Sequence, residues 1–264
     1  FFNQTPAPAD LRLDSTSEQI RQALWQSAPR WSTLQMEGTV TWYNSDGSTQ
    51  SAQEKIWLDP LNSKFKVELN GVINNSNHII KLSDGVNVYD VNVVTNQIQT
   101  FSYPDSARVG QYIPPVVEGE AYPNPIWGQI GTPLDNLAFA SDYSQTKGTF
   151  APVAVESLAG RETLAVNWTY IENSSPSLKM WIDTELGILL KLQQFSKDGS
   201  GVLETESVVN SVSINPMIDT AVFTLPQEYQ AVLSAPTDQV GTIPFVTESS
   251  SQVEEEAGEL YFFY

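Results

Sequence analysis

Apolar and polar residues alternate over two long stretches of this chain, and this period of two restricts those stretches to β-structure with one buried face. In residues 34–42 the even positions are apolar except Gly38, and the odd positions are polar. Residues 64–69 alternate without exception. Turn signals such as Asp46-Gly47 and Asp84-Gly85 separate the runs. The pattern predicts strands near 34–43, 51–58, 64–70, 77–83, 86–92 and 97–103, joined as an antiparallel meander.

The N-terminal residues predict a tether followed by one helix. Residues 1–13, which are rich in Pro and Ala, have no periodic pattern and are expected to form the tether. Residues 14–28 favour a helix, because Ser15-x-x-Glu18 has the pattern of a capping box and Pro29 stops the element. The apolar stripe of this helix consists of Ile20, Ala23, Leu24 and Ser27.

A proline-rich insertion divides the two alternating stretches. Residues 104–132 contain five prolines and are expected to leave the sheet. A helix near 133–144 should follow, with Thr132 as the N-cap and Pro133 as the first helical residue. Alternation then resumes over 150–226, including a strand near 202–214, so residues 14–226 are predicted to form one domain.

The remaining residues, 227–264, are predicted to be an acidic, solvated tail. No Lys or Arg follows Lys197, whereas Glu254, Glu255 and Glu256 form an acidic run. The aromatic end of the tail, 260–264, breaks this pattern.

Composition argues against most catalytic chemistry. The 264 residues carry a formal charge of −18, which would repel nucleic acid and anionic lipid surfaces. No cysteine is present, which excludes disulfides, thiol catalysis and Cys-ligated metals. A Ser-His-Asp triad would have to use His78, the single histidine, and a metal site would need further ligands. We therefore expect a protein that is not an enzyme and that needs no cofactor and no metal.

Four segments in order resemble motifs of one superfamily. Residues 55–60 resemble a strand that ends in an Asp-Pro turn, and residues 84–90 resemble a "DG…YD" hairpin. Residues 181–191 are similar to a "W-I-D-x-x-x-G-x-x-x-K" strand–turn–strand, and residues 215–226 are similar to a closing "P-x-D-x-x-x-F-x-x-P" segment. Together, over roughly 14–226, they resemble the LolA/LolB/RseB-like superfamily of periplasmic lipoprotein carriers and their relatives.

The resemblance implies a mainly β fold with some α (α+β): a curved antiparallel half-barrel of about eleven strands, lidded by the N-terminal and mid-chain helices. It also implies an apolar concave face that holds acyl chains or other lipids without chemistry, in an extracytoplasmic protein (periplasm or cell surface). The candidate groove residues are Met36, Val40, Trp42, Ile56, Leu58, Phe65, Val67, Leu69, Leu164, Val166, Trp168, Leu178, Met180 and Ile182. The alternative is that these side chains are core, packed against the helices of 14–28 and 133–144.

Several aromatic residues are candidates for partner contacts. Trp181 alternates out of phase with Met180 and Ile182, so we expect it on the convex face, where it could contact a partner. The terminal candidates are Phe1, Phe2, Leu260, Tyr261, Phe262, Phe263 and Tyr264. They could belong to a membrane tether outside the given chain, fold back into the groove, or join copies of the chain at open sheet edges. The acidic surface favours a protein partner with a basic surface.

Two function hypotheses remain. The first is a carrier or sensor that binds a lipid, a lipoprotein acyl chain or another hydrophobic ligand in the half-barrel. The second is a structural or assembly subunit of an envelope complex or extracellular polymer, which uses its termini and sheet edges for contacts. A carrier should have space or a bound ligand inside the sheet, whereas a scaffold should have side chains there.

Overall fold

Eleven strands and several short helices make up the part of the chain that the structure describes. This computed structural model describes residues 7–71, 77–102, 126, 130–145, 147–172, 175–196, 198 and 200–233. The helices are α1 (Ser17–Trp25), α2 (Pro133–Ala138), α3 (Asp142–Gln145) and α4 (Gln227–Leu233), with 3-10 turns η1 (Ala28–Arg30), η2 (Pro60–Asn62) and η4 (Thr220–Phe223). The strands are β1 (Leu34–Tyr43), β2 (Thr49–Asp59), β3 (Lys64–Gly71), β4 (Asn77–Asp84), β5 (Asn87–Asn92), β6 (Gln97–Ser102), β7 (Gly148–Leu158), β8 (Arg161–Tyr170), β9 (Leu178–Asp183), β10 (Leu189–Phe195) and β11 (Leu203–Ile214).

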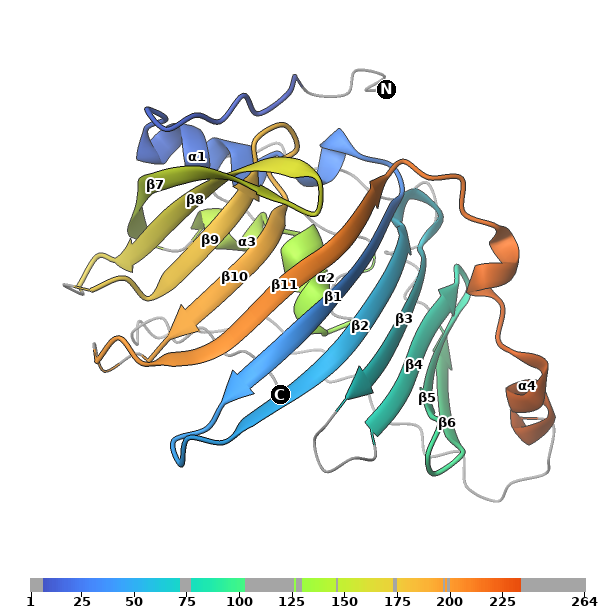
Figure 1. The fold of residues 1–264 in the computed structure, drawn as a ribbon. Coiled ribbons are helices and arrows are strands. Elements are labelled where there is room, and N and C mark those ends of the chain that lie inside the picture. Colours follow the sequence, from blue (N-terminus) through green and yellow to red (C-terminus); the bar gives the residue numbers. More distant parts are fainter. Residues whose placement is uncertain are drawn as a thin grey trace, which may run out of the picture.

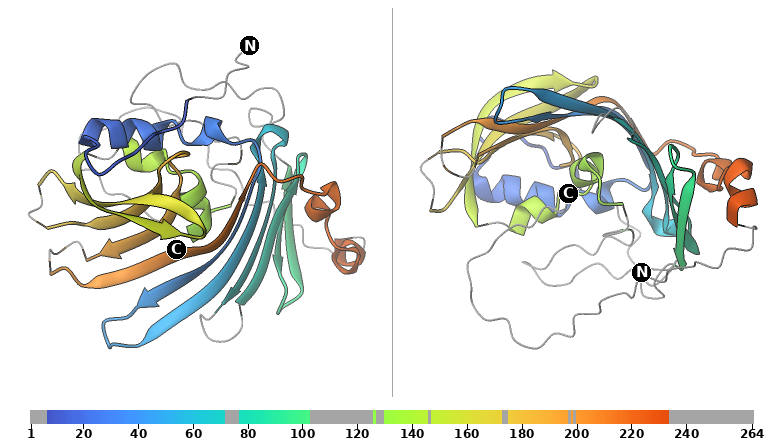
Figure 2. Two further views of the ribbon diagram at one scale, coloured as in Figure 1. Left: turned by 45° about the horizontal axis from the view of Figure 1, so that its top comes forward. Right: turned by 90° about the horizontal axis from the view of Figure 1, so that it is seen from below.

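All these strands belong to one open antiparallel sheet (Figure 1). Its order is β6-β5-β4-β3-β2-β1-β11-β10-β9-β8-β7, so two meanders are joined where β1 pairs with β11. The six strands predicted for the first meander are confirmed, with boundaries that differ by at most two residues. The sheet curls around α1, α2 and α3 and does not close (Figure 2). The lidded half-barrel implied by the resemblance is therefore confirmed.

Helix α1 starts one residue later than its predicted capping box would require. The capping box is Thr16-x-x-Gln19, in which each side chain hydrogen-bonds the backbone of the other residue. The Ser15 hydroxyl instead accepts a hydrogen bond from the Arg12 backbone N–H in the preceding turn. The predicted stripe is confirmed, because Ile20, Ala23, Leu24 and Ser27 are all buried.

The single helix predicted near 133–144 is wrong in extent, since the structure contains two short helices there. Helix α2 ends at Ala138, and Phe139 leaves the helical region with φ −106° and ψ 65°. Phe139 and Ala140 between the two helices are buried in the main core, so the backbone breaks where it directs these side chains inward. Helix α3 then resumes at Asp142 and packs against α1.

The segment predicted as a solvated tail begins with a helix, α4. Helix α4 and η4 lie on the convex side of β3–β6 (Figure 2). Leu225 and Tyr229 form a second small core there with Ile80, Leu82 and Val91. Packing on this outer face explains why the convex side chains of β4 and β5 are apolar. Residues 234–264 lie outside the described residues.

Part of the predicted tether is attached to the domain. Backbone N–H groups of Ala9 and Leu11 donate to Glu185 and Thr184 in the β9–β10 turn, at 2.8 and 3.1 Å. The Leu11 side chain is buried in the main core. Residues 9–11 therefore extend the domain on its N-terminal side.

The contacts of the β9–β10 turn explain two residues of its sequence. The buried Asp183 carboxylate accepts hydrogen bonds from the backbone N–H groups of Glu185 and Leu186 and forms an ion pair with Arg161. Gly187 adopts φ +78°, and a Cβ there would lie 2.2 Å from the Ala23 carbonyl oxygen. The Asp and the Gly of the 181–191 motif thus shape a turn that packs closely against α1.

We expect Gly187→Ala to destabilise the domain by more than about 1 kcal/mol, because it combines an unfavourable φ with a backbone clash. Gly47→Ala is the matched control, since Gly47 has φ +82° and open space where a Cβ would be. Urea unfolding would measure both free energies of unfolding. Equal losses for the two variants would contradict the close packing of this turn on α1.

Candidate functional site

The predicted groove residues share the concave face of the sheet. The register places Met36, Ile56 and Val67 in one row across β1–β3, and Val166, Met180 and Leu192 in another across β8–β10. Eleven of the fourteen are at most 5% exposed, and Trp42, Leu69 and Leu178 are half-buried. Side chains from α1 and α2, including Ile20, Leu24, Leu134 and Leu137, belong to the same core cluster. Over the described residues, the concave face is thus filled by the protein's own helices.

Helix α2 packs on the concave face at a position where β1 has a glycine and β2 has a glutamate. Gly38 of β1 and Glu54 of β2 are register partners. A Cβ at Gly38 would lie 3.0 Å from a Leu134 Cδ atom, so the missing side chain makes room for Leu134. The same Cβ would lie 2.5 Å from the Val208 carbonyl oxygen of β11, so both this backbone contact and Leu134 explain why Gly38 interrupts the apolar alternation of β1. We call Gly38, Glu54 and Leu134 the lid socket.

Glu54 takes over the capping of α2. Thr132 is at the N-cap position, as predicted, but its hydroxyl makes no capping hydrogen bond and donates instead to Glu54 Oε1. The Leu134 backbone N–H donates to Glu54 Oε2 at 3.1 Å. A strand residue therefore satisfies the start of the helix, which fixes α2 to the concave face at this point.

A second carboxyl group is buried beside this cap. Glu54 and Asp135 are 0% and 6% exposed. Burial raises the pKa of Glu54 from its ordinary 4.5 to about 7, against the opposing effect of the Thr132 and Leu134 hydrogen bonds. Burial, and then the charge of Glu54, raise the pKa of Asp135 from 3.8 to about 8. Asp135 Oδ1 has no hydrogen-bond partner among the described residues.

The charges around this pair come from three further elements. Asp142 of α3 raises the pKa of Asp135, whereas Lys81 of β4 lowers it. Lys81 Nζ also donates to the Ile130 carbonyl oxygen at 3.1 Å and lies 3.6 Å from Asp90 Oδ2. Lys81 thus links the residues before α2 to the sheet, but it does not neutralise both buried acids.

Helix α1 is held in a different way, by two arginines. Arg21 donates to the carbonyl oxygens of Ser144 and Gly148. Arg30 donates to those of Ala7, Ala23 and Leu186 at 2.8–3.1 Å. These bonds tie α1 to α3, to β7 and to the β9–β10 turn. Helix α2 is thus held at its start by a buried carboxyl group, whereas α1 is held by cationic side chains.

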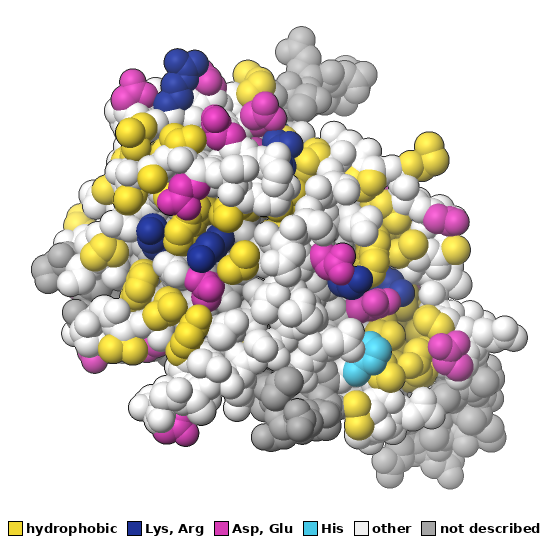
Figure 3. Space-filling model, in the orientation of Figure 1, with side chains coloured by type: hydrophobic (Ala, Val, Ile, Leu, Met, Phe, Trp, Pro, Cys, Tyr) yellow, Lys and Arg dark blue, Asp and Glu magenta, His cyan; other side chains and the backbone are white. Residues whose placement is uncertain are grey.

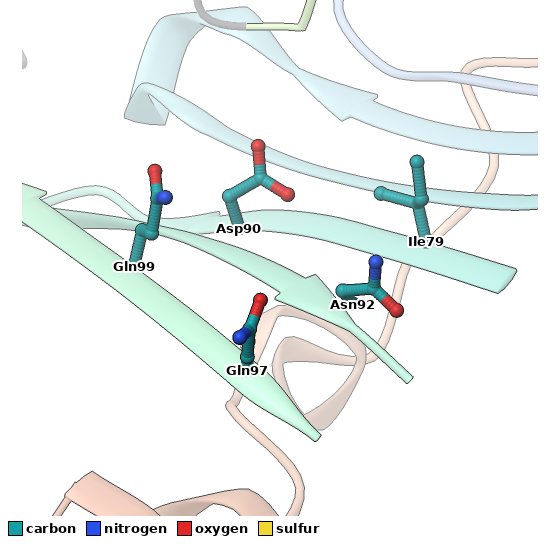
Figure 4. Close-up of a pocket in the computed structure, with 5 residues that line it drawn as sticks. All are labelled: Ile79, Asp90, Asn92, Gln97 and Gln99. Carbon is teal, nitrogen blue, oxygen red and sulfur yellow. The ribbon is translucent and has the colours of Figure 1, made fainter. Parts of the chain in front are cut away.

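The concave face becomes polar beyond β3. A cavity of about 210 Å³ there is lined by residues of β4, β5 and β6 (Figure 4). Its lining consists of Ile79, Asp90, Asn92, Gln97 and Gln99, which we call the polar shelf. The register places Val67, Lys81, Asp90 and Gln99 in one row, so the shelf continues the apolar face. It was not predicted from the sequence.

Trp181 lies on the convex face but is not exposed, in contrast to the expectation. Its ring is 5% exposed because the ammonium groups of Lys179 and Lys191 lie over it, 4.6 and 4.8 Å from ring centroids. Its indole N–H donates to Glu156 at 2.9 Å. Figure 3 shows basic side chains among apolar ones on this face, over β8–β10. A partner at this place would first meet the two lysines.

The other candidates for partner contacts cannot be placed. Phe1, Phe2 and Leu260–Tyr264 lie outside the described residues.

Within the described ranges, no group of three or more His, Asp or Glu side chains could hold a metal ion. The helices in those ranges include none that is long and apolar enough to cross a membrane.

The lid socket was missed, although the sequence contains a signal for it. Glu54 is the one charged residue among Ala52, Ile56 and Leu58 on the apolar face of its strand. A charge on such a face requires a polar partner, which here comes from residues 132–134. The partner is 78 residues away along the chain, so the pattern could flag Glu54 but not identify α2.

Comparisons with known proteins bear on the fold alone. No protein-family model matches the sequence, and no curated protein matches it. Similar solved structures include MucB, with 13% identity over 80% of this chain and 63% of that chain, and a TM-score of 0.46. The MucA/MucB complex of Pseudomonas aeruginosa matches with 14% identity, 80% and 60% coverage, and a TM-score of 0.42.

A LolA superfamily protein from Nitrosomonas europaea is also similar, with 12% identity, coverage of 80% and 98%, and a TM-score of 0.31. The chain spans about three fifths of the length of the MucB chains. Because these TM-scores are below 0.5, the fold assignment rests on the strand order of the sheet itself.

Proposed function

We propose that this protein binds a hydrophobic ligand, such as a lipid or a lipoprotein acyl chain, between the concave face of the sheet and α2. Helix α2 acts as the lid that the ligand displaces. The binding involves no covalent chemistry. The observation that carries the proposal is a pair of buried carboxyl groups at this six-residue helix: Glu54 of β2, which faces the start of the helix, and Asp135 within the helix.

Glu54 caps α2, but a permanent core would gain nothing from the Asp135 carboxyl, one oxygen of which has no hydrogen-bond partner among the described residues. A buried carboxylate is costly unless it is paired, and the charge of Glu54 adds to the effect of burial in raising the pKa of Asp135. Helix α2 is therefore held less firmly than its apolar contacts alone would hold it. Segments of low local stability are the ones that open to admit ligands.

The apolar contacts explain why a ligand could replace α2. Leu134 and Leu137 contribute methyl and methylene groups to the same cluster as Met36 and Ile56. An acyl chain offers the same surface, and each buried CH₂ contributes about 0.8 kcal/mol. A chain of ordinary length can offset the loss of two leucine side chains from the core.

Native mass spectrometry with organic extraction tests this function on protein purified from its own host without detergent. We expect a stoichiometric lipid or acylated peptide, or binding of added acyl lipid by the empty protein. A protein that takes up no acyl ligand at any pH between 5 and 8 would exclude the proposal.

The filled concave face favours a second candidate, a structural or assembly subunit. Eleven groove positions that are at most 5% exposed give this face the packing expected of a scaffold. On this reading, the chain ends and the edges β6 and β7 make contacts between subunits. Deletion of residues 257–264 should then change the sedimentation coefficient, and an unchanged oligomeric state would count against this role.

The proposed function also includes a cellular location and a kind of partner. We infer an extracytoplasmic protein, tethered to the envelope, that docks on a partner with a basic surface. The formal charge of −18 supports such a partner, because complementary charge speeds association. Salt should then slow complex formation with that partner.

A further inference from the structure

We propose that the polar shelf binds the uncharged, hydroxyl-rich headgroup of a glycosylated lipid, whose acyl chain lies under α2. This inference rests on the proposed function and names the class of ligand. It is drawn from the charge, hydrogen-bonding groups, size and position of the shelf.

The charge of the shelf disfavours an anionic headgroup. Its lining contains one carboxylate, Asp90, and no cation. Lys81, the register partner of Asp90, is already engaged by Asp90 and by the Ile130 carbonyl oxygen. A phosphate would meet a carboxylate without a free cation, in a chain with a net charge of −18.

The hydrogen-bonding groups suit hydroxyls. Gln97 and Gln99 are exposed, each carries a donor and an acceptor, and neither has a side-chain hydrogen bond to a described residue. The Asn92 oxygen accepts backbone N–H groups of Val94 and Thr95, which leaves its NH₂ as a donor. The amides can donate hydrogen bonds to hydroxyl groups, and the glutamine oxygens and the Asp90 carboxylate can accept hydrogen bonds from them. Figure 4 shows the five side chains on neighbouring strands around one space.

The size of the shelf indicates a headgroup rather than a whole ligand. The cavity of about 210 Å³ is smaller than the about 300–1,000 Å³ of typical small-molecule pockets. The rest of the ligand must therefore lie elsewhere.

The shelf lies close enough to the lid socket for the rest of the ligand to lie under α2. Asn92, Ile79 and Leu69 are register partners across β5, β4 and β3, and Leu69 pairs with Glu54 of the lid socket. Neighbouring strands are about 4.8 Å apart, so three spacings separate the shelf from the socket by about 14 Å. An acyl chain that starts at the shelf can run across the strands and under α2.

The headgroup site can be tested without any lipid. Methyl β-glucoside at millimolar concentration should shift the NMR side-chain amide signals of Asn92, Gln97 and Gln99 in the full chain. Glycerol 3-phosphate should leave them unchanged. The double variant Gln97→Ala/Gln99→Ala should lose the glucoside response.

Lipid preference then tests the complete proposal by native mass spectrometry. Glucosyl diacylglycerol should bind at least about tenfold more tightly than phosphatidylglycerol with the same acyl chains, and the double variant should remove this preference. Thr100→Ala is the matched control, because Thr100 is exposed on the opposite face of β6. It should retain the preference.

The outcomes separate the two proposals. Equal affinity for both lipids, or a preference that survives the double variant, would overturn the headgroup site and leave the lid proposal intact. A glucoside response without any lipid binding would support the headgroup site and reject the lid proposal. No glucoside response and no lipid preference would overturn the headgroup site.

Discussion

Raising the pH from 5 to 8 is expected to loosen helix α2 while the sheet stays folded. The pKa values of Glu54 and Asp135 are raised to about 7 and about 8. In the unfolded chain both groups titrate near pH 4. Between pH 4 and 8 the folded protein therefore holds more protons than the unfolded one, so stability falls as the pH rises.

Hydrogen exchange at the backbone amides of α2 measures this effect. The protection factor of the Leu134 amide should fall by at least about tenfold over this range, since one pKa unit corresponds to about 1.36 kcal/mol. Amides of β9 should keep their protection. The affinity for an acyl ligand under the lid should increase as the pH rises from 5 to 8.

The double variant Glu54→Gln/Asp135→Asn should remove the pH dependence. It keeps the shape of both side chains and has no charge to bury. We expect it to be more stable than the natural chain at pH 8 by at least about 1.4 kcal/mol. Glu37→Gln is the control, because Glu37 is an exposed carboxylate that pairs with Lys55 at 2.5 Å. A double variant with the same pH profile as the natural chain would contradict the role of the acid pair.

The sheet could be predicted from the sequence because its determinants are local. The alternation of 34–42 and 64–69 fixes which face of each strand is buried, and Asp-Gly turns fix where the strands end. The same local rules placed Trp181 on the convex face. They could not show that Lys179 and Lys191 would cover its ring, because rotamers of long side chains depend on their neighbours.

The end of α2 was predicted less well than its start, because the end depends on distant groups. Thr132 and Pro133 identified the start, whereas the end is set by the burial of Phe139 in the main core. Neither that burial nor the hydrogen bonds of Glu54 to the start of α2 can be read from a window of ten residues. Occupancy of the groove was equally hidden, since alternation identifies the residues that share a face but not what covers that face.

The polar shelf escaped prediction for a related reason. Gln97 and Gln99 lie on an edge strand, where polar residues on either face are ordinary. Their significance comes only from the register, which places them in rows with Asp90 and Asn92 and then with the apolar face. A pattern within one strand cannot reveal a row that crosses five strands.

A leucine in the lid and a leucine in α1 should respond differently to truncation, although both are fully buried. Leu134 and Leu24 are each 0% exposed and belong to the same core cluster. Leu134→Ala and Leu24→Ala should each cost about 2–5 kcal/mol of stability. Urea unfolding is expected to show comparable losses, because each variant leaves a cavity in the same core.

Only Leu134→Ala should increase binding of an apolar probe such as diphenylhexatriene at pH 5, where the lid is closed. The observed dissociation constant of a site behind a lid is the intrinsic constant divided by the fraction of open molecules. Leu134 fills the lid socket over Gly38, so its truncation raises that fraction, and we expect affinity to rise about tenfold. Leu24→Ala leaves α1 anchored through Arg21 and Arg30 and should not change probe binding.

The comparison separates a lid from a loosened core. Equal gains in probe affinity for both variants would mean that the probe enters any destabilised core, and α2 would lose its special role. No gain in either variant would favour the scaffold, since its concave face is filled permanently. A gain at pH 5 confined to Leu134→Ala would identify α2 as the gate. Weaker probe binding at pH 8 in Glu54→Gln/Asp135→Asn than in the natural chain would identify the acid pair as the part that weakens it.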